Sequence, residues 1–197
     1  KRYMHGYFPL TNWVRECEYI VNLPKFKTHE YMILTGAVKN LFGLVPGTFK
    51  LECHKNFHQP ERFANVLLDI YEAVRPALSI VDGISGIEGN GPATSGMKRD
   101  FGLVLAGSDA VALDSVLSKI MNIRPDYVFT NKEARKRNIG NVDLDNIEIR
   151  GCAISSCAVV NFKLPETSLT QAIRNNLWQP IANILMRLLT FHPKIDS

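Results

Sequence analysis

Strand-like apolar runs alternate with segments of helical periodicity along this 197-residue chain, and this order constrains its fold more than any other feature. Apolar residues recur at helical spacing over 63–74 and again over 110–121. Between these segments lie two short apolar runs, 78–81 and 101–106, of the length typical of strands. Alternating strands and helices are typical of α/β domains. We therefore predict an α/β fold with a mainly parallel sheet and helices on both faces.

The remaining segments have weaker patterns. The connection at 47–58 is polar and aromatic without a clear period, so no element is predicted there. The glycine-rich stretch at 83–96 is predicted to be a loop. Apolar runs and turn residues predict a strand over 19–23, a helix over 33–44, a strand over 147–149 and strand or extended chain over 152–164.

The chain is predicted to divide near residue 165. Residues 1–165 would form the α/β domain, and 166–197 a helical segment that packs on it or leads to a missing module. The chain begins with Lys1 rather than Met, so we expect a fragment whose fold is incomplete at the N-terminus. No apolar stretch follows the first residues, so a signal peptide is not predicted.

Composition narrows the functional classes. The formal net charge is +4, and its basic residues are not gathered in blocks, so nucleic-acid binding is not predicted. No apolar run reaches the roughly 18 residues of a membrane span, and we expect a cytoplasmic protein without membrane contact. The four cysteines are predicted to be reduced thiols, as is usual in a cytosolic protein. None forms a CxxC pair and no His stands at zinc-finger spacing, so a metal site is not predicted. Cys152 and Cys157, five residues apart, would face opposite sides of an extended strand.

The strongest local signal for a site is a set of basic side chains after the 19–23 strand. Lys25, Lys27 and His29 stand at alternate positions, and Lys39-Asn40 follows within an apolar segment. These side chains suit an anion clamp, with Lys27 or His29 available for proton transfer. A solvated loop explains Lys25 and Lys27 equally well, but a lysine among apolar neighbours must reach water, pair or bind something.

Two further strand ends carry polar residues. Asp82 stands directly before the glycine-rich stretch, which contains Glu88 and Asn90. The carboxylates of Asp82 and Glu88 can hold a hard cation such as Mg²⁺ or a ligand hydroxyl, although an ordinary flexible loop is the simpler interpretation. Asp109 precedes the 110–121 helix and can be its N-cap. Asp114 lies among apolar residues of that helix and requires a partner.

In an open parallel sheet, ligands bind at the carboxyl ends of the strands. The three strand ends therefore predict a site for a small anionic ligand, a phosphorylated or carboxylated metabolite, bound with a divalent cation. These residues indicate a binding site and do not specify a reaction.

The motifs LPKFKTH, TGAVKNLFG, DGI followed by GxEGNGP, and GSDAVALD resemble, in this order, the family catalogued as domain of unknown function 362. The resemblance covers roughly residues 15–151. Members of that family often carry a ferredoxin-like module with two four-iron four-sulfur clusters. The resemblance thus implies a redox setting and a ferredoxin-like partner, in cis or in trans. Any iron–sulfur cluster is expected only in a missing adjacent module, because the cluster-binding cysteine run is absent from this chain.

Two hypotheses follow. The first is a redox-linked enzyme domain of unspecified reaction, with Lys27 and His29 as the catalytic proton-handling pair and Asp82 and Glu88 as metal ligands. Its ligand-binding residues would be Lys25, Lys39, Asn40, Asn90, Asp109 and Asp114. The alternative is a non-catalytic docking scaffold for a ferredoxin-like module or partner protein, with an exposed apolar patch around Trp178 and Phe191. The sequence leaves homo-oligomerisation open.

Overall fold

The computed structural model describes residues 8–91 and 96–166. The chain divides into two units after Pro165, and the described elements lie in the first unit. They are α1 (Trp13–Glu16), β1 (Val21–Asn22), β2 (Lys25–His29), β3 (Ile33–Thr35), α2 (Ala37–Asn40), η1 (Leu41–Leu44), α3 (Gly47–Asn56), α4 (Pro60–Val74), β4 (Leu78–Gly89), β5 (Gly96–Gly107), α5 (Ala110–Ile120), η2 (Pro125–Tyr127), α6 (Phe129–Arg137), η3 (Leu144–Asn146) and α7 (Ile154–Cys157).

Strand β4 is the centre of a five-stranded sheet. Strands β1 and β2 pair with it in parallel along one edge, with Val21 opposite Leu78 and Lys25 opposite Asp82. Strand β5 pairs antiparallel with the other edge of β4, and β3 pairs antiparallel with β2. The predicted α/β fold is confirmed, and its sheet contains both parallel and antiparallel pairings.

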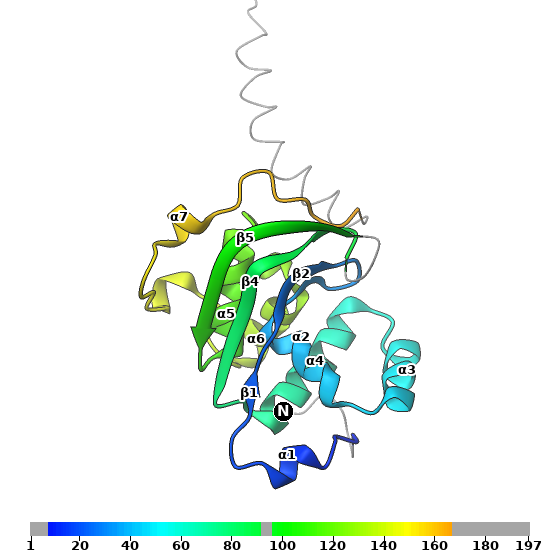
Figure 1. The fold of residues 1–197 in the computed structure, drawn as a ribbon. Coiled ribbons are helices and arrows are strands. Elements are labelled where there is room, and N and C mark those ends of the chain that lie inside the picture. Colours follow the sequence, from blue (N-terminus) through cyan, green and yellow to red (C-terminus); the bar gives the residue numbers. More distant parts are fainter. Residues whose placement is uncertain (1–7, 92–95, 167–197) are drawn as a thin grey trace, which may run out of the picture. The chain divides into compact units, whose positions relative to one another are not determined.

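The core lies between the sheet and the helices. Figure 1 shows α5 and α6 behind the β4–β5 pair. The apolar stripe predicted over 63–74 is buried in α4, where Phe63, Leu67 and Ile70 have no exposed surface. Burial of each such side chain contributes about 1.5–3 kcal/mol. Ile84 and Val104 are each 62% exposed, so the described helices leave this part of the sheet uncovered.

The prediction of a loop over 83–96 was wrong for its first half, because β4 continues through Gly89. Glycine is required there by close approach of the neighbouring strand. A Cβ atom on Gly86 would lie 2.1 Å from the backbone oxygen of Phe26. The glycines thus allow β2 to lie against β4, and they do not mark a flexible loop.

The helix predicted over 33–44 is also corrected. Its first residues form β3, and helical backbone begins only at Ala37, after Gly36. The apolar run of β3 is too short for periodicity to separate strand from helix. The segment 47–58, for which no element was predicted, contains α3.

The chain after α6 differs from the sequence-based expectation as well. Residues 147–149 do not form a strand, and the expected extended segment 152–164 contains the single helical turn α7. This turn brings residues into proximity that an extended chain would separate.

Candidate functional site

Five basic side chains from three elements form the feature that we call the basic cluster. Lys27 and His29 come from β2, Lys39 from α2, and Lys50 and His54 from α3. They lie close enough for their charges to act on one another. Burial, followed by the charges of Lys27 and Lys50, lowers the pKa of Lys39 to about 8. The structure therefore brings together three of the predicted site residues, Lys27, His29 and Lys39.

Two ammonium groups of the cluster converge on one aromatic ring. The Nζ atoms of Lys39 and Lys50 each lie 6.0 Å from the ring centroid of Phe42. That ring packs edge-on against His54 at 5.8 Å between centroids, and His54 stacks on Phe63 at 4.9 Å. Cation–π attraction offsets only part of the repulsion between the two ammonium groups. The ammonium groups of Lys39 and Lys50 thus lie beside packed aromatic rings, which make their surroundings apolar.

The three lysines of the cluster have no carboxylate partner in the part of the chain that the structure describes. No ion pair joins Lys27, Lys39 or Lys50 to an aspartate or glutamate among residues 8–91 and 96–166. Removing charge from water without a partner is unfavourable. The arrangement is therefore well suited to an anion that neutralises it.

His29 is held as a neutral hydrogen-bonding group. Its Nδ1 accepts hydrogen bonds from the backbone N–H groups of Tyr31 (3.1 Å) and Met32 (3.3 Å), which places the ring proton on Nε2. Burial, then the charges of Lys39, His54 and Lys27, lowers the pKa of His29 to about 3. A base with this pKa is poorly matched to neutral pH. His29 is thus suited to donate a hydrogen bond through Nε2.

Asp114 positions the cluster. It is 1% exposed, and its two carboxylate oxygens accept hydrogen bonds from the backbone N–H groups of Ala37 (2.6 Å) and Val38 (3.1 Å). These N–H groups begin α2, which carries Lys39. A Cβ atom on Gly36 would lie 2.0 Å from the Asp114 carboxylate, so glycine is required at that position. Burial raises the pKa of Asp114 to about 7. The carboxylate predicted to bind ligand instead fixes the helix that bears Lys39.

Asn40 also has a structural contact. Its Nδ2 donates a 2.8 Å hydrogen bond to Oδ1 of Asn22 on β1. Asn22 in turn donates to the backbone oxygen of Ala37 at 2.9 Å. This chain of hydrogen bonds joins both ends of α2 to the sheet and fixes the direction of the intervening Lys39.

The remaining predicted site residues lie elsewhere. Lys25 Nζ is 2.7 Å from Asp82 Oδ2, in a half-exposed ion pair, and this hydrogen bond lowers the pKa of Asp82. Asp109 is the N-cap of α5 and accepts hydrogen bonds from the N–H groups of Val111 and Ala112. Asn90 follows β4 directly.

The two predicted metal ligands are not brought together. Glu88 is buried and accepts hydrogen bonds from Arg99 Nη1 at 2.9 Å and from the backbone N–H of Lys163 at 3.2 Å. Asp82 is six residues away on β4, a separation of roughly 20 Å along a strand. Among the described residues, His, Cys, Asp and Glu side chains form no group of three able to hold a metal ion. Each carboxylate has a protein cation as its partner instead.

Sequence reasoning did not include Lys50 and His54 in this site. Both lie on α3, in the segment without periodicity, and their approach to Phe42 depends on tertiary packing. The nearest available signal was the pair His54 and His58, four residues apart, which resembles a metal-ligand spacing.

Two comparisons with known proteins found a match. The model of the family described as "Domain of unknown function (DUF362)" matches residues 2–119. The thylakoid-associated protein sll1697 of Synechocystis sp. is 36% identical over 158 residues, which are 80% of this chain and 49% of that protein. The chain therefore spans about half the length of this relative. No solved structure matches. No described helix is both long and apolar enough to cross a membrane.

Proposed function

The chain belongs to the family of domain of unknown function DUF362, and we propose that it binds a small anionic ligand at the basic cluster. The observation that carries this proposal is Lys39, whose half-buried ammonium group has no carboxylate partner in the described part of the chain. Burial, then the charges of Lys27 and Lys50, lowers the pKa of Lys39 to about 8, so the charged form is disfavoured at this position.

The chemistry of the cluster favours a phosphorylated or carboxylated metabolite. Lys27, Lys39 and Lys50 supply point charges that bind phosphate or carboxylate oxygens. Neutral His29 adds a donor that does not increase the repulsion. A bound anion would raise the pKa of Lys39 toward its ordinary value, so binding near pH 8 is coupled to proton uptake.

Mg²⁺ is not required in this proposal. Asp82 and Glu88 lie too far apart to share one ion, and both are paired with protein cations. The ligand is held by the lysines of the cluster, and no step is assigned to a metal.

The test uses inorganic phosphate and citrate as probes, with chloride keeping the ionic strength constant. Either anion should raise the melting temperature of the wild-type protein, because a ligand that binds only the folded state stabilises it by about 2.7 kcal/mol at 100 times its Kd. Calorimetry near pH 8 in buffers of different ionisation enthalpy should detect the proton uptake.

Lys39→Met should abolish the melting-temperature shift, and Lys27→Met should weaken it. Lys25→Met is the matched control, since that lysine is exposed and paired with Asp82. A shift of equal size in wild type, Lys39→Met and Lys25→Met would exclude the basic cluster as the binding site.

A second candidate function is docking of a partner protein, such as a ferredoxin-like domain in cis or in trans. The exposed apolar side chains Leu23, Ile84 and Val104 favour it. The patch predicted around Trp178 and Phe191 lies outside the described residues. A Val104→Lys variant separates the two functions, because it should weaken docking and leave the phosphate-induced shift unchanged.

A further inference from the structure

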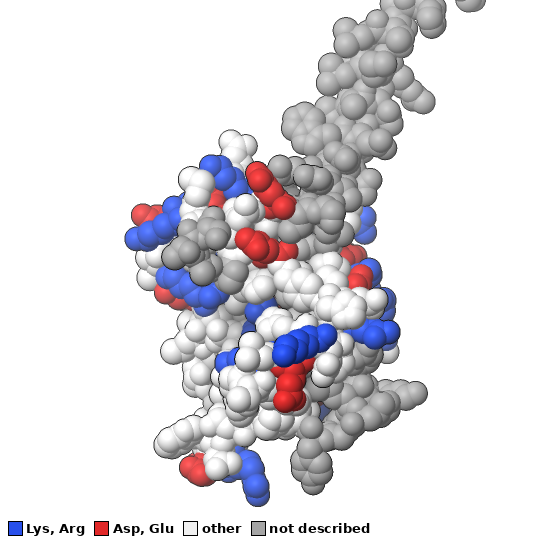
Figure 2. Space-filling model, turned by 90° about the vertical axis from the view of Figure 1, so that its right-hand side faces the viewer, with Lys and Arg blue, Asp and Glu red and all other residues white. Residues whose placement is uncertain are grey.

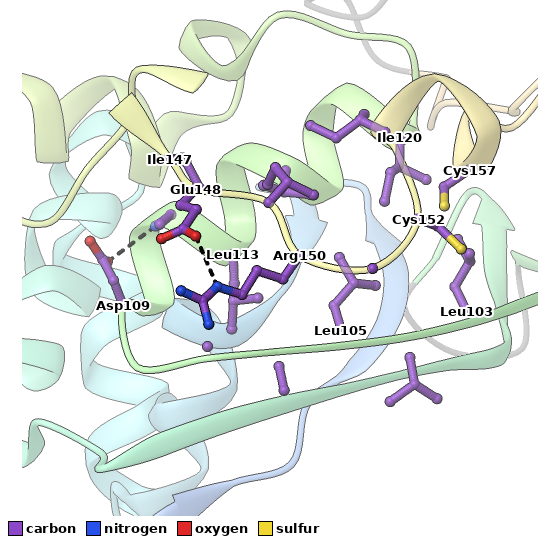
Figure 3. A pocket seen from close by; sticks show the side chains of 18 of the residues that line it. Leu103, Leu105, Asp109, Leu113, Ile120, Ile147, Glu148, Arg150, Cys152 and Cys157 are labelled. Carbon is purple, nitrogen blue, oxygen red and sulfur yellow. Dashed lines mark hydrogen bonds and ion pairs between the residues drawn. The ribbon is translucent and has the colours of Figure 1, made fainter. Parts of the chain in front are cut away.

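Cys152 and Cys157 lie beside each other at the rim of an apolar cavity of about 490 Å³ (Figure 3). The cavity is bounded by β5, by α5 and by residues 147–157. Its apolar lining includes Leu103, Leu105, Leu113, Ile120 and Ile147. This feature is separate from the basic cluster, and the inference drawn from it does not depend on the proposed function.

The backbone between the two cysteines turns back on itself. Gly151, immediately before Cys152, has a φ of +94°, which favours glycine and redirects the chain. Residues Ile154–Cys157 then form the turn α7, in which the N–H of Ser156 donates to the backbone oxygen of Ala153. In an extended chain, residues five apart are separated by roughly 16 Å. The turn instead brings the side chains of Cys152 and Cys157 close to each other (Figure 3).

The two thiols differ in accessibility. Both are unpaired cysteines, with Cys152 exposed and Cys157 partly exposed. Burial, then the neighbouring Cys152, raises the pKa of Cys157. Since the thiolate is the nucleophile, Cys152 meets a dissolved oxidant first and Cys157 reacts second.

We propose that Cys152 and Cys157 form a reversible dithiol–disulfide pair, oxidised by low-molecular-weight disulfides such as oxidised glutathione. The Cys152 thiolate attacks one sulfur of the oxidant, which forms a mixed disulfide and releases one thiolate. The Cys157 thiolate then attacks the Cys152 sulfur, which forms the internal disulfide and releases the second thiolate. Two protein thiols are oxidised, one small disulfide is reduced to two thiols, and the two protons leave with those products.

The internal disulfide fixes the segment that borders the cavity. On its far side, this segment is anchored by the N–H of Val159, which donates to the backbone oxygen of Ile120 at 2.9 Å. Joining Cys152 to Cys157 constrains the remaining span between that anchor and Gly151. Oxidation therefore reduces the freedom of residues 152–157 to move away from α5.

Mass spectrometry tests the proposal on the full chain in glutathione buffers of increasing oxidised fraction, with acid quenching and maleimide labelling. Trypsin cleaves after Arg150 and Lys163, so both cysteines fall in the peptide 151–163. In oxidising buffers this peptide should lose two hydrogens and take no maleimide, and dithiothreitol should reverse the change. A peptide that keeps two maleimide groups, or that accumulates glutathione, would overturn the proposal.

Single substitutions provide the matched variants. Cys152→Ser and Cys157→Ser should each leave a thiol that accumulates a glutathione adduct, because no resolving thiol is present. Cys17 is the internal control, because it is exposed and lies outside the proposed pair, and it should carry glutathione in the wild-type protein. If the 151–163 peptide of the wild type shows the same glutathione occupancy as the two variants, the cysteines act independently and the pair does not exist.

Discussion

Two groups of cations in this molecule show how different neighbourhoods give similar residues different roles. Helix α6 and its flanks carry Lys132, Arg135, Lys136 and Arg137, each paired with a carboxylate. Arg137, 12% exposed, lies 2.7 Å from both Asp69 and Glu72 of α4. The basic cluster contains three lysines with no such partner in the described residues. Two of the α6 cations, Lys132 and Arg137, join α6 to α4, whereas the lysines of the basic cluster have no carboxylate partner among the described residues.

The number of basic residues therefore does not indicate where an anion-binding site lies. The absence of carboxylate partners does. On the face shown in Figure 2, Lys and Arg side chains are interspersed with Asp and Glu and do not form a continuous basic stripe. Unpaired charge at one place favours a small, localised anion.

The largest change in stability is expected for Arg137, which is paired with two carboxylates of α4. Arg137→Met should destabilise the protein by about 3–5 kcal/mol, because it leaves the fully buried carboxylate of Asp69 without its cation. Urea unfolding at pH 7 measures the change. A loss below about 1 kcal/mol would show that the pair between α4 and α6 is not structural.

Lys39→Met should stabilise the protein, an effect on the free energy of unfolding opposite in sign to that of Arg137→Met. Because the folded-state pKa of Lys39 is about 8 and the unfolded value is 10.5, the charged lysine opposes folding by on the order of 3 kcal/mol below pH 8. The folded state binds fewer protons than the unfolded state between pH 8 and 10.5, so wild-type stability rises with pH across that window. The variant should thus be more stable than wild type at pH 7, with the difference closing by pH 10.5.

Unfolding curves of wild type and Lys39→Met at pH 7, 9 and 10.5 provide the measurement. The subtraction removes other titrating groups common to both proteins. A variant that is less stable than wild type at pH 7 would mean that Lys39 has a stabilising partner and that the comparison with α6 fails.

The smallest effect is expected at Arg135. Its partners Asp126 and Asp143 are both exposed to solvent, and Arg135 itself is 41% exposed. Arg135→Gln should change stability by roughly 0.5 kcal/mol or less, because exposed ion pairs are screened by water and salt. Thermal unfolding at low and high salt checks this value. A large, salt-sensitive loss of stability would show that the ion pairs of Arg135 are structural, as those of Arg137 are expected to be.

The sequence pointed to three of the five residues that the structure brings together in the basic cluster. Lys27, His29 and Lys39 were identified because polar groups after a strand, or inside an apolar segment, require an explanation. Lys25 belongs to the same pattern but pairs with Asp82 instead. The register between β2 and β4 shifts between Lys25 and Lys27, an irregularity that depends on pairing between distant segments.

The carboxylates show a second limit of sequence reasoning. Asp109 was predicted to be an N-cap and Asp114 to need a partner. The carboxylates of both residues accept hydrogen bonds from backbone N–H groups. Nothing local to Asp114 specifies that its partner is the start of α2, because that contact spans 77 residues of sequence. A buried carboxylate predicts a hydrogen bond without indicating where the donor lies.

By itself, the sequence determined the α/β class, the buried stripe of α4 and the family to which the chain belongs, since these depend on local periodicity and short motifs. Tertiary structure alone decided that α3 contributes Lys50 and His54 to the cluster, that Asp82 and Glu88 have separate partners, and that Cys152 meets Cys157. Each of these outcomes depends on side chains brought together by packing. Their charges and thiols acquire their properties from neighbours that the local sequence does not specify.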